Sequence, residues 1–327
     1  MEHVLVTGVA GFIGSHLAED LLRRGVTVTG VDSRSPASDP GAAENLAGLV
    51  SNPSFHLVVA DLVTADLTPL LEDVPVVFHL AAMAGVRRSW GDRFADYLAC
   101  NVIATQRLLE ACAAAEVPRL IAASSSSVYG HSRPDPSRED DPLEPASPYG
   151  VTKLAAERLC AAYATRRHAS TSVVALRYFT VYGPRQRPDM AISRILRAAT
   201  SGRGVPLYGD GRQRRDFTYV GDAVAATVAA ATADAQMAVV NVGSGRSTTL
   251  SEVLDLVAAI TGTDVRVLHR LDQPGDVEVT AADLARAEGL LGYQPSTDLA
   301  EGLRRQWAWL TSRQRGSDRT TADVAGL

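Results

Sequence analysis

Cysteine is scarce in this sequence, and its spacing argues against two common ways of holding a fold together. The 327 residues include three cysteines, Cys100, Cys112 and Cys160, an odd number without any C-x-x-C arrangement. Disulfide frameworks and structural zinc sites both require paired or closely spaced cysteines. We interpret the three as small buried apolar residues in a reducing cytoplasm, and we expect neither a disulfide nor a metal site.

The sequence also lacks a basic stripe and a long apolar run. Its 32 Lys and Arg are scattered among 37 Asp and Glu, which leaves a net charge of −5 and does not indicate nucleic acid or a membrane surface as partner. No apolar run reaches the roughly 18 residues that a membrane span needs, and Met1-Glu2-His3 lacks the basic start of a signal peptide. We expect a soluble, cytoplasmic α/β protein, because 46% hydrophobic content suits one large domain with or without a smaller partner.

A strand, a glycine turn and a helix open the chain. The β-branched run at 4–7 leads into Gly8, Gly11 and Gly14, after which a helical pattern continues to Arg24. Glycines at this spacing permit a tight turn and a close approach of the backbone to a pyrophosphate, which the helix N-terminus also attracts. The stretch therefore predicts a dinucleotide site.

A second strand at 26–31 ends at Asp32, 18 residues after Gly14. A carboxylate at this place can accept a hydrogen bond from the adenosine ribose, and it would repel a 2′-phosphate. We therefore favour NAD over NADP, although Arg34 leaves NADP open.

Further apolar strands end in small or polar residues. The strand at 55–60 precedes Asp61, the strand at 76–80 precedes Ala81-Ala82, and the strand at 120–123 precedes four serines, 124–127. Because ligands bind at the carboxyl ends of strands in open α/β sheets, these residues should line one crevice. Arg87, in the loop after the second of these strands, is a candidate anion contact or a solvated loop arginine.

The chemistry should centre on Tyr149. Ser147 and Pro148 have the features of a helix N-cap and first helical position, and Lys153 follows Tyr149 by four residues on the same helix face. A neighbouring ammonium favours the phenolate, so we expect Lys153 to lower the pKa of Tyr149 and make it an acid and base near neutral pH.

Together these stretches resemble the extended short-chain dehydrogenase/reductases, and within them the nucleotide-sugar epimerases and dehydratases. The resemblance covers residues 4 to about 309 and rests on Thr7-Gly8-x-x-Gly11-Phe12-Ile13-Gly14, Asp32, His79-Leu80-Ala81-Ala82, the serine run and Tyr149-x-x-x-Lys153. It implies that Ser125 holds the sugar hydroxyl beside Tyr149, that Lys153 binds the nicotinamide ribose and that Asn101 supports the site. The implied NAD contacts are Gly8, Gly11, Phe12, Ile13, Gly14, Asp32, Asp61, Leu62, Leu80, Ala81, Ala82, Asn101, Ser124, Tyr149, Lys153 and Tyr178.

The second half of the chain resembles the substrate side of that family. The loop at 179–190 is similar to a substrate loop, Arg215 to an arginine that clamps the pyrophosphate, and the acidic residue of Gln273-Pro274-Gly275-Asp276 to one that meets the nucleotide ribose. The implied substrate contacts are Arg87, Ser126, Ser127, Thr180, Arg187, Met190, Arg215 and Asp276.

Two departures narrow the class. Dehydratases of the family carry Asp-Glu directly after the hydroxyl residue, whereas this chain has Ser126 and Ser127, so no carboxylate is available there to eliminate water. Thr180 stands where most relatives carry Asn, and with Arg187-Pro188-Asp189-Met190 it resembles the UDP-glucuronate 4-epimerases. Met83 differs from a Gln common in that group.

We expect a Rossmann-type doubly wound parallel sheet with a smaller, discontinuous substrate-binding domain. The predicted boundaries are 1–182 plus 237–260 for NAD and 183–236 plus 261–315 for substrate, with a flexible tail at 316–327. Helices at 97–115 and 148–166 resemble the pair that forms the family's dimer interface, so we expect a homodimer. The expected activity is an NAD-dependent UDP-sugar 4-epimerase acting on UDP-glucuronate. UDP-glucose 4-epimerase, UDP-glucuronate decarboxylase and a non-enzymatic NAD-binding regulator remain open.

Overall fold

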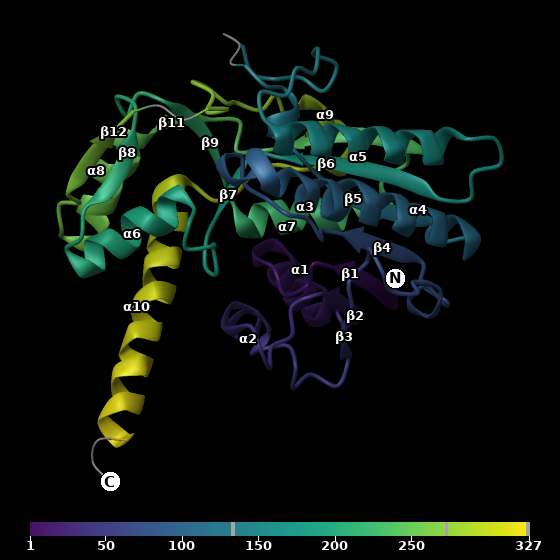
Figure 1. Cartoon of the computed structure of the whole chain (residues 1–327), viewed down its shortest axis with the longest axis horizontal. Coiled ribbons are helices and arrows are strands. Elements are labelled where there is room, and N and C mark those ends of the chain that lie inside the picture. The colour runs from purple at the N-terminus through teal and green to yellow at the C-terminus, as the bar shows by residue number, and fades with distance from the viewer. Residues whose placement is uncertain (132–134, 272–273, 325–327) are drawn as a thin grey trace.

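A parallel sheet of seven strands forms the centre of the computed structural model, which describes residues 1–131, 135–271 and 274–324, with side chains placed as far as Arg313 (Figure 1). The strand order is β10-β6-β5-β4-β1-β2-β3, and each neighbouring pair runs parallel. The strands are β1 His3–Thr7, β2 Thr27–Asp32, β3 Phe55–Val59, β4 Val76–His79, β5 Arg119–Ser125, β6 Ser172–Tyr178 and β10 Met237–Val242.

Both faces of this sheet are buried, which explains why its strands read as continuous apolar runs. In β1, Val4 and Val6 belong to one hydrophobic cluster and Leu5 to another, because successive side chains of a strand point to opposite faces. The first cluster includes side chains of α1, α2, α7 and α9, and the second includes side chains of α4 and α5. The predicted doubly wound Rossmann-type fold is confirmed.

The helices that cover the two faces follow the strands in alternation. On one face lie α1 Phe12–Arg23, α2 Pro40–Leu46, α7 Val220–Ala229 and α9 Ala285–Leu291. On the other lie α3 Phe94–Leu98, a π-helical turn η4 Ala99–Ile103, α4 Ala104–Ala114 and α5 Pro148–Thr165. Short 3₁₀ turns occur at Thr68–Leu70, Arg87–Ser89, Gly91–Arg93, Ser126–Val128 and Ala230–Thr232.

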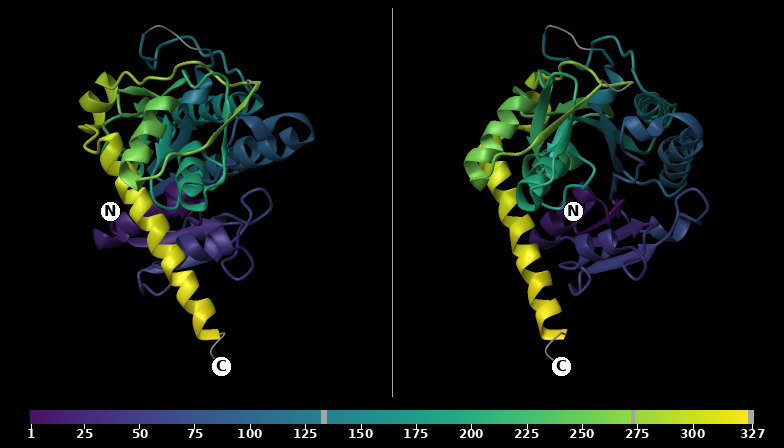
Figure 2. Two further views of the ribbon diagram at one scale, coloured as in Figure 1. Left: turned by 90° about the vertical axis from the view of Figure 1, so that its left-hand side faces the viewer. Right: turned by 60° about the vertical axis from the view of Figure 1, so that its left-hand side comes forward.

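A second, smaller part of the molecule lies beyond the carboxyl ends of the strands. It contains a sheet of β7 Thr180–Tyr182, β9 Arg214–Tyr219 and β11 Ser247–Thr249, and a pair formed by β8 Val205–Tyr208 and β12 Val267–Arg270. Its core joins α6 Ala191–Ser201, α8 Leu250–Thr261 and α10 Leu299–Val324. Figure 2 shows α10 extending away from the rest of the chain.

The packing differs from the predicted boundaries at three helices. α7 and α9, assigned to the substrate part from the sequence, pack on the large sheet, and α8, assigned to the cofactor part, packs with α6 and α10. A helix that leads into a parallel edge strand packs back onto its sheet, and α7 leads into β10 in this way. α10 includes residues 316–324 of the expected tail. Residues 325–327 and Gln273 lie outside the described residues.

A buried ion pair joins β6 to α5. Arg177 Nη2 lies 2.6 Å from Glu157 Oε1, and both side chains are 2% exposed. The guanidinium also donates to the hydroxyl of Tyr129 at 2.9 Å, and Ser124 Oγ donates to Glu157 at 2.9 Å. Although burial opposes it, the hydrogen bonds and charge of Glu157 raise the pKa of Arg177. Removing one partner of such a pair typically costs about 3–5 kcal/mol, because the other charge is left buried and unpaired.

Candidate active site

The N-terminus of α5 holds Tyr149 beneath the 3₁₀ turn at Arg87–Ser89. Ser147 Oγ accepts a hydrogen bond from the Gly150 backbone at 3.1 Å and Pro148 occupies the first turn, as the sequence predicted. The Tyr149 backbone N–H donates to Ser89 Oγ at 3.0 Å, so a buried serine satisfies a group that the helix leaves free. Tyr149 is therefore fixed at its backbone as well as its ring.

Ser125 and Tyr149 meet as expected, but the pKa of Tyr149 differs from the prediction. Burial raises the pKa of Tyr149 above its usual value, while the hydrogen bond with Ser125 and the charge of Arg187 oppose the rise. Lys153 was expected to lower it. Instead, Lys153 Nζ donates to the Ala123 carbonyl at 2.7 Å, which directs the ammonium toward the end of β5.

Lys153 is itself fully enclosed. Burial lowers its pKa from 10.5 to about 8, so its ammonium loses a proton more readily than a surface lysine does. The structure therefore places two buried proton-carrying groups, Tyr149 and Lys153, on one helix face, and burial shifts their pKa values in opposite directions, upward for Tyr149 and downward for Lys153.

The glycine loop between β1 and α1 has no room for side chains. A Cβ on Gly8, whose φ is +72°, would lie 2.6 Å from the Ala81 nitrogen, and a Cβ on Gly14 would lie 2.2 Å from the Gly8 carbonyl oxygen. No side chain caps α1 in the part of the chain that the structure describes, so its first N–H groups remain available to phosphates. This bare cradle fits the pyrophosphate of a dinucleotide.

Asp32 closes the adenosine end of the cradle. Its carboxylate accepts hydrogen bonds from the Ala10 backbone at 3.0 Å and from the Arg34 backbone at 3.0 Å. The Arg34 guanidinium lies 3.2 Å from the same carboxylate, so this arginine is paired with the residue expected to repel a 2′-phosphate.

Other predicted cofactor residues lie around the same crevice, although several side chains have partners within the protein. Ser124 Oγ donates to Glu157, Asp61 accepts from the Val63 backbone at 2.9 Å and Leu62 lies in the core. The Tyr178 hydroxyl bonds to Thr227 at 2.7 Å beneath α7. Cofactor contacts at Leu62 and Tyr178 would therefore come from the backbone, and these roles stay predictions.

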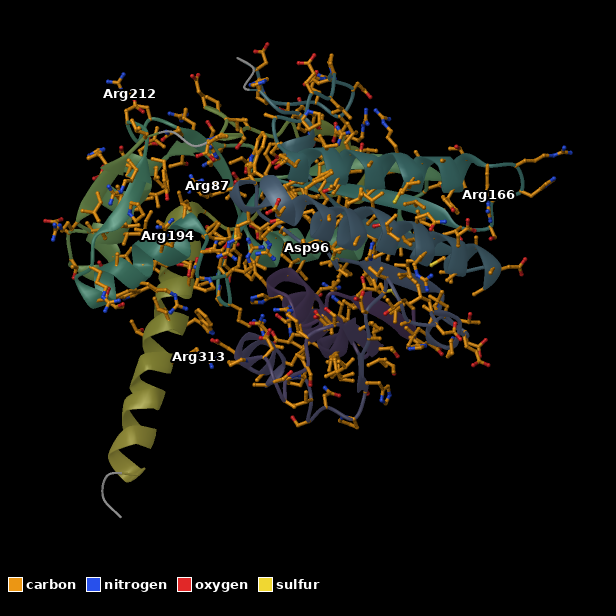
Figure 3. All side chains as sticks on the ribbon, in the orientation of Figure 1. Arg87, Asp96, Arg166, Arg194, Arg212 and Arg313 are labelled. Carbon is orange, nitrogen blue, oxygen red and sulfur yellow. The ribbon has the colours of Figure 1, made fainter. Side chains whose placement is uncertain are left out.

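Arg87, Arg215 and Asp276 gather where the two parts of the molecule meet. Arg87 Nη2 lies 2.7 Å from Asp276 Oδ2, and its guanidinium stacks 3.9 Å above the ring of Tyr208 in β8. Burial lowers the pKa of Arg215, and the nearby Asp276 partly restores it. Figure 3 shows Arg87 between the large sheet and the α6–β8 lobe. Two guanidinium groups beside an aromatic ring suit a nucleoside diphosphate.

The residues expected to meet the sugar come from the serine run after β5 and from the segment between β7 and α6. Ser126 and Ser127 begin the 3₁₀ turn after β5, and the Ser127 N–H donates to Ser125 Oγ at 3.1 Å. Thr180 begins β7, and Met190 is the N-cap of α6. Arg187 pairs with Asp189 at 3.1 Å, and its charge acts on both Tyr149 and Tyr97.

Several residues that hold this site are not indicated by the sequence. Tyr97 packs edge-on against Tyr149 at 6.2 Å, and its hydroxyl donates to the Gly85 carbonyl at 3.0 Å. Arg185, at φ +64°, reaches from the loop after β7 to Glu19 of α1 at 2.5 Å. Glu19 lies 166 residues earlier in the chain, so no local spacing indicated this pair.

Comparison with known proteins identifies the family. A sequence model of the NAD dependent epimerase/dehydratase family matches residues 4–243. The chain belongs to this family. NAD is the cofactor that this membership assigns, and the family that the motifs suggested is confirmed.

Relatives cover nearly the whole chain. It is 43% identical over 317 residues to the uncharacterized UDP-glucose epimerase YtcB of Bacillus subtilis, covering 96% of this chain and 99% of that protein. It is 36% identical over 315 residues to the UDP-glucuronate 4-epimerase of Thermodesulfobacterium geofontis, covering 94% and 96%. The crystal structure of UDP-glucuronic acid 4-epimerase from Bacillus cereus with UDP-glucuronic acid and NAD matches with a TM-score of 0.90 and 38% identity, covering 95% of this chain and 99% of that one.

Two features are absent from the described residues, a metal-binding cluster and a membrane-spanning helix. Within 1–131, 135–271 and 274–324, no group of three or more His, Cys, Asp or Glu side chains is arranged to hold a metal ion. None of the helices in the same ranges is long and apolar enough to cross a membrane.

The buried His79 predicts a pH dependence of stability. Burial, with the charge of Lys153, lowers its pKa from 6.5 to about 3. His79 therefore binds a proton in the unfolded chain at pH values where it stays neutral in the folded chain. The stability that neutral His79 contributes is present above pH ~6.5 and is lost as the pH falls toward ~3. Between pH 7 and 5 this residue alone should lower the unfolding free energy by about 2 kcal/mol.

Urea unfolding at the two pH values measures this loss. His79→Gln should remove that part of the pH dependence, whereas the same substitution at the exposed His56 should retain it. An identical pH dependence in the wild type and His79→Gln would show that folding does not lower the pKa of His79.

Proposed function

We propose that this chain is an NAD-dependent 4-epimerase that interconverts UDP-glucuronate and UDP-galacturonate. The observation that carries the proposal is the enclosed pair of hydroxyls, Ser125 and Tyr149, with the Arg187 charge facing Tyr149 and no carboxylate at Ser126 or Ser127. Relatives named UDP-glucuronate 4-epimerase support the choice of sugar.

The residues around the glycine cradle would hold NAD. The N–H groups of the first turn of α1 and the backbone of Gly8 and Gly11 would meet its phosphates, and Asp32 its adenosine ribose. When bound, NAD supplies a reversible acceptor and donor of hydride at carbon 4 of the sugar. Because both half-reactions use the same pair of electrons, the net redox change is zero.

Proton transfer is assigned to Tyr149. Tyr149 in its phenolate form takes the proton of the sugar hydroxyl, and the resulting phenol returns it after the 4-keto sugar has turned over, while Ser125 holds the oxygen in place. Burial raises the pKa of Tyr149, whereas the hydrogen bond with Ser125 and the charge of Arg187 oppose this rise and so favour the phenolate that the transfer requires.

The substrate carboxylate requires protection during the keto stage. A ketone at carbon 4 is β to that carboxylate, and such acids lose carbon dioxide when the breaking bond stands perpendicular to the carbonyl plane. Hydroxyls of Ser126, Ser127 and Thr180, with the guanidinium of Arg187, would hold the group near the ring plane and keep it charged. Hydrogen bonds to charged groups contribute about 1.5–3 kcal/mol each, enough for two of them to change a product ratio about a hundredfold.

Two other activities use the same tyrosine chemistry. A UDP-glucose 4-epimerase has no carboxylate to hold, and the relative YtcB carries that activity in its name. A UDP-glucuronate decarboxylase would release the carboxylate instead of retaining it. The charge of Arg187, which acts on Tyr149, supports retention.

Incubation with a panel of UDP-sugars, followed by product analysis, tests the activity. Wild-type protein should convert UDP-glucuronate to its 4-epimer, and Tyr149→Phe should lower turnover by about 10² to 10⁴-fold while still binding the UDP-sugar, because only the transferable proton is lost. Tyr163→Phe, near the other end of α5, is the matched control and should keep wild-type turnover. Near-normal turnover by Tyr149→Phe would refute the mechanism.

Removing a carboxylate contact should change the product. Thr180→Ala and Arg187→Ala should weaken UDP-glucuronate binding and increase the fraction of pentose product, since the carboxylate then rotates out of the ring plane. Arg212→Ala, at a side chain that is 90% exposed and lies on the far lobe in Figure 3, should change neither. Equal turnover of UDP-glucose and UDP-glucuronate, with no effect of either site substitution, would instead support the hexose epimerase.

We also infer a homodimer that pairs through α5 and through the helical stretch made of α3, η4 and α4. Apolar side chains on this side of the molecule are unusually exposed for a monomer: Phe94 (37%), Leu98 (41%), Ile103 (44%) and Val151 (47%). α4 and α5 lie side by side (Figure 1), and a second copy would bury this face by forming a four-helix contact.

The three free cysteines fit a cytoplasmic location.

A charge on this face should separate the subunits. Ile103→Glu is expected to convert the dimer to a monomer, because a dimer would bury the carboxylate without a partner. Val59→Glu, at an equally exposed apolar residue in the edge strand β3, is the control and should leave the dimer intact. Light scattering after size exclusion gives the masses, and a wild-type monomer would refute the inference.

A further inference from the structure

A continuous chain of buried hydrogen bonds connects the ends of β1 and β4 to α4 and η4 near the active site. At one end the Ala81 backbone donates to Thr7 Oγ1 at 3.2 Å, and Thr7 Oγ1 lies 2.8 Å from His79 Nδ1. On the other side of the ring, His79 Nε2 lies 2.9 Å from Thr105 Oγ1, which donates to the Asn101 carbonyl at 2.7 Å. The four side chains involved, Thr7, His79, Asn101 and Thr105, are at most 4% exposed.

The donors in this line can be assigned by exclusion. Thr105 has one hydroxyl proton and gives it to the carbonyl of Asn101, which cannot donate. His79 Nε2 must therefore carry the proton that it shares with Thr105. In a neutral ring Nδ1 is then an acceptor, and Thr7 donates its hydroxyl proton to it while accepting from Ala81.

The line continues from Asn101 to Tyr149. The Asn101 amide oxygen accepts from the Met83 backbone at 2.8 Å, and its nitrogen donates to the Met83 carbonyl and to Thr152 Oγ1, both at 3.0 Å. Thr152 Oγ1 in turn donates to the Tyr149 carbonyl at 2.8 Å. Asn101 lies in the π-helical turn η4, an irregularity that must be stabilised by contacts of this kind.

We propose that His79 is a positioning residue for the reaction, which with its proton on Nε2 couples the cofactor wall at Thr7 and Ala81 to the Asn101 turn that holds Tyr149. The two ring nitrogens have separate tasks. Nδ1 holds Thr7 at the end of β1, against which the glycine loop packs. Nε2 holds Thr105, which binds the η4 turn, and the Asn101 side chain of that turn binds Met83 and α5. The ring touches neither the sugar nor Tyr149 itself.

The surroundings keep the ring neutral. The charge of Lys153 on α5 opposes a second proton, Glu157 and Cys160 of α5 line the same small cavity, and Thr7 of β1 and Thr105 of α4 are the hydrogen-bonding neighbours of the ring. A doubly protonated ring would donate from Nδ1 to Thr7, which would leave the Thr7 hydroxyl proton without the acceptor that the neutral ring provides.

Two substitutions separate the tasks of the nitrogens. In His79→Asn, the amide oxygen can replace Nδ1 as acceptor, but the bond to Thr105 is lost. In His79→Gln, the amide nitrogen can replace Nε2 as donor, but the bond from Thr7 is lost. We expect His79→Gln to raise the dissociation constant of NAD by about 10-fold and to lower turnover less than His79→Asn, which should lower turnover at saturating NAD by about 10-fold or more.

A second pair of variants covers failure of the histidine variants to fold. Thr105→Val removes the hydroxyl at constant shape and should reproduce the turnover loss of His79→Asn. Thr105→Ser keeps the hydroxyl and should retain wild-type turnover. If Thr105→Val and Thr105→Ser turn over equally, or if both histidine variants change NAD affinity and turnover in the same ratio, His79 is a core residue without this role and the proposal is refuted.

Nitrogen NMR of ¹⁵N-histidine-labelled protein tests the assignment without activity. The His79 signals should show a protonated Nε2 and an unprotonated Nδ1, unchanged from pH 8 to pH 5, whereas the opposite tautomer or a titration in this range would refute the proposal. The turnover comparison rests on the proposed function. If wild-type protein epimerises no UDP-sugar, that function fails, while NAD affinity and the NMR signals still decide the role of His79.

Discussion

The ion pair between Arg177 and Glu157 joins the elements from which the active site is built. Arg177 comes from β6 and Glu157 from α5, and the pair also binds Ser124 at the end of β5 and Tyr129 beyond the serine run. A charge enclosed this deeply remains stable only when every donor and acceptor around it is matched. The positions of the serine run and of the helix that carries Tyr149 are therefore set together, because neither can shift without leaving a buried charge unpaired.

Because these elements are held together, one crevice contains residues for both the cofactor and the sugar nucleotide. The large sheet supplies the glycine cradle and Asp32 at one place, and Ser125 with Tyr149 at another, all at the carboxyl ends of parallel strands. The smaller part contributes Arg215 and the Tyr208 ring, which meet Arg87 from the large part. Gly275, at φ +81°, brings the Asp276 loop against Ser147 at the start of α5, so the two halves of the substrate site also contact each other.

The sequence predicted the fold and the centre of the site because both depend on short-range patterns. The glycine spacing, the strand that ends at Asp32 and the Ser147-Pro148 helix start are local, and each lies where it was expected. What the sequence did not predict depends on long-range packing. The pKa of Tyr149 follows from its burial, the Arg185–Glu19 pair joins distant segments, and the placement of α7 and α8 follows from which core each helix completes.

The Arg185–Glu19 contact has a mechanical consequence. It fastens the loop after β7 to α1, the helix whose first turn closes the glycine cradle, and His16 reinforces it through the Pro184 carbonyl at 2.8 Å. These two walls of the crevice are consequently linked to each other. Moving them apart would break this ion pair, so we expect a sugar that presents first one face and then the other to rotate about the bonds of its own diphosphate rather than to widen the crevice.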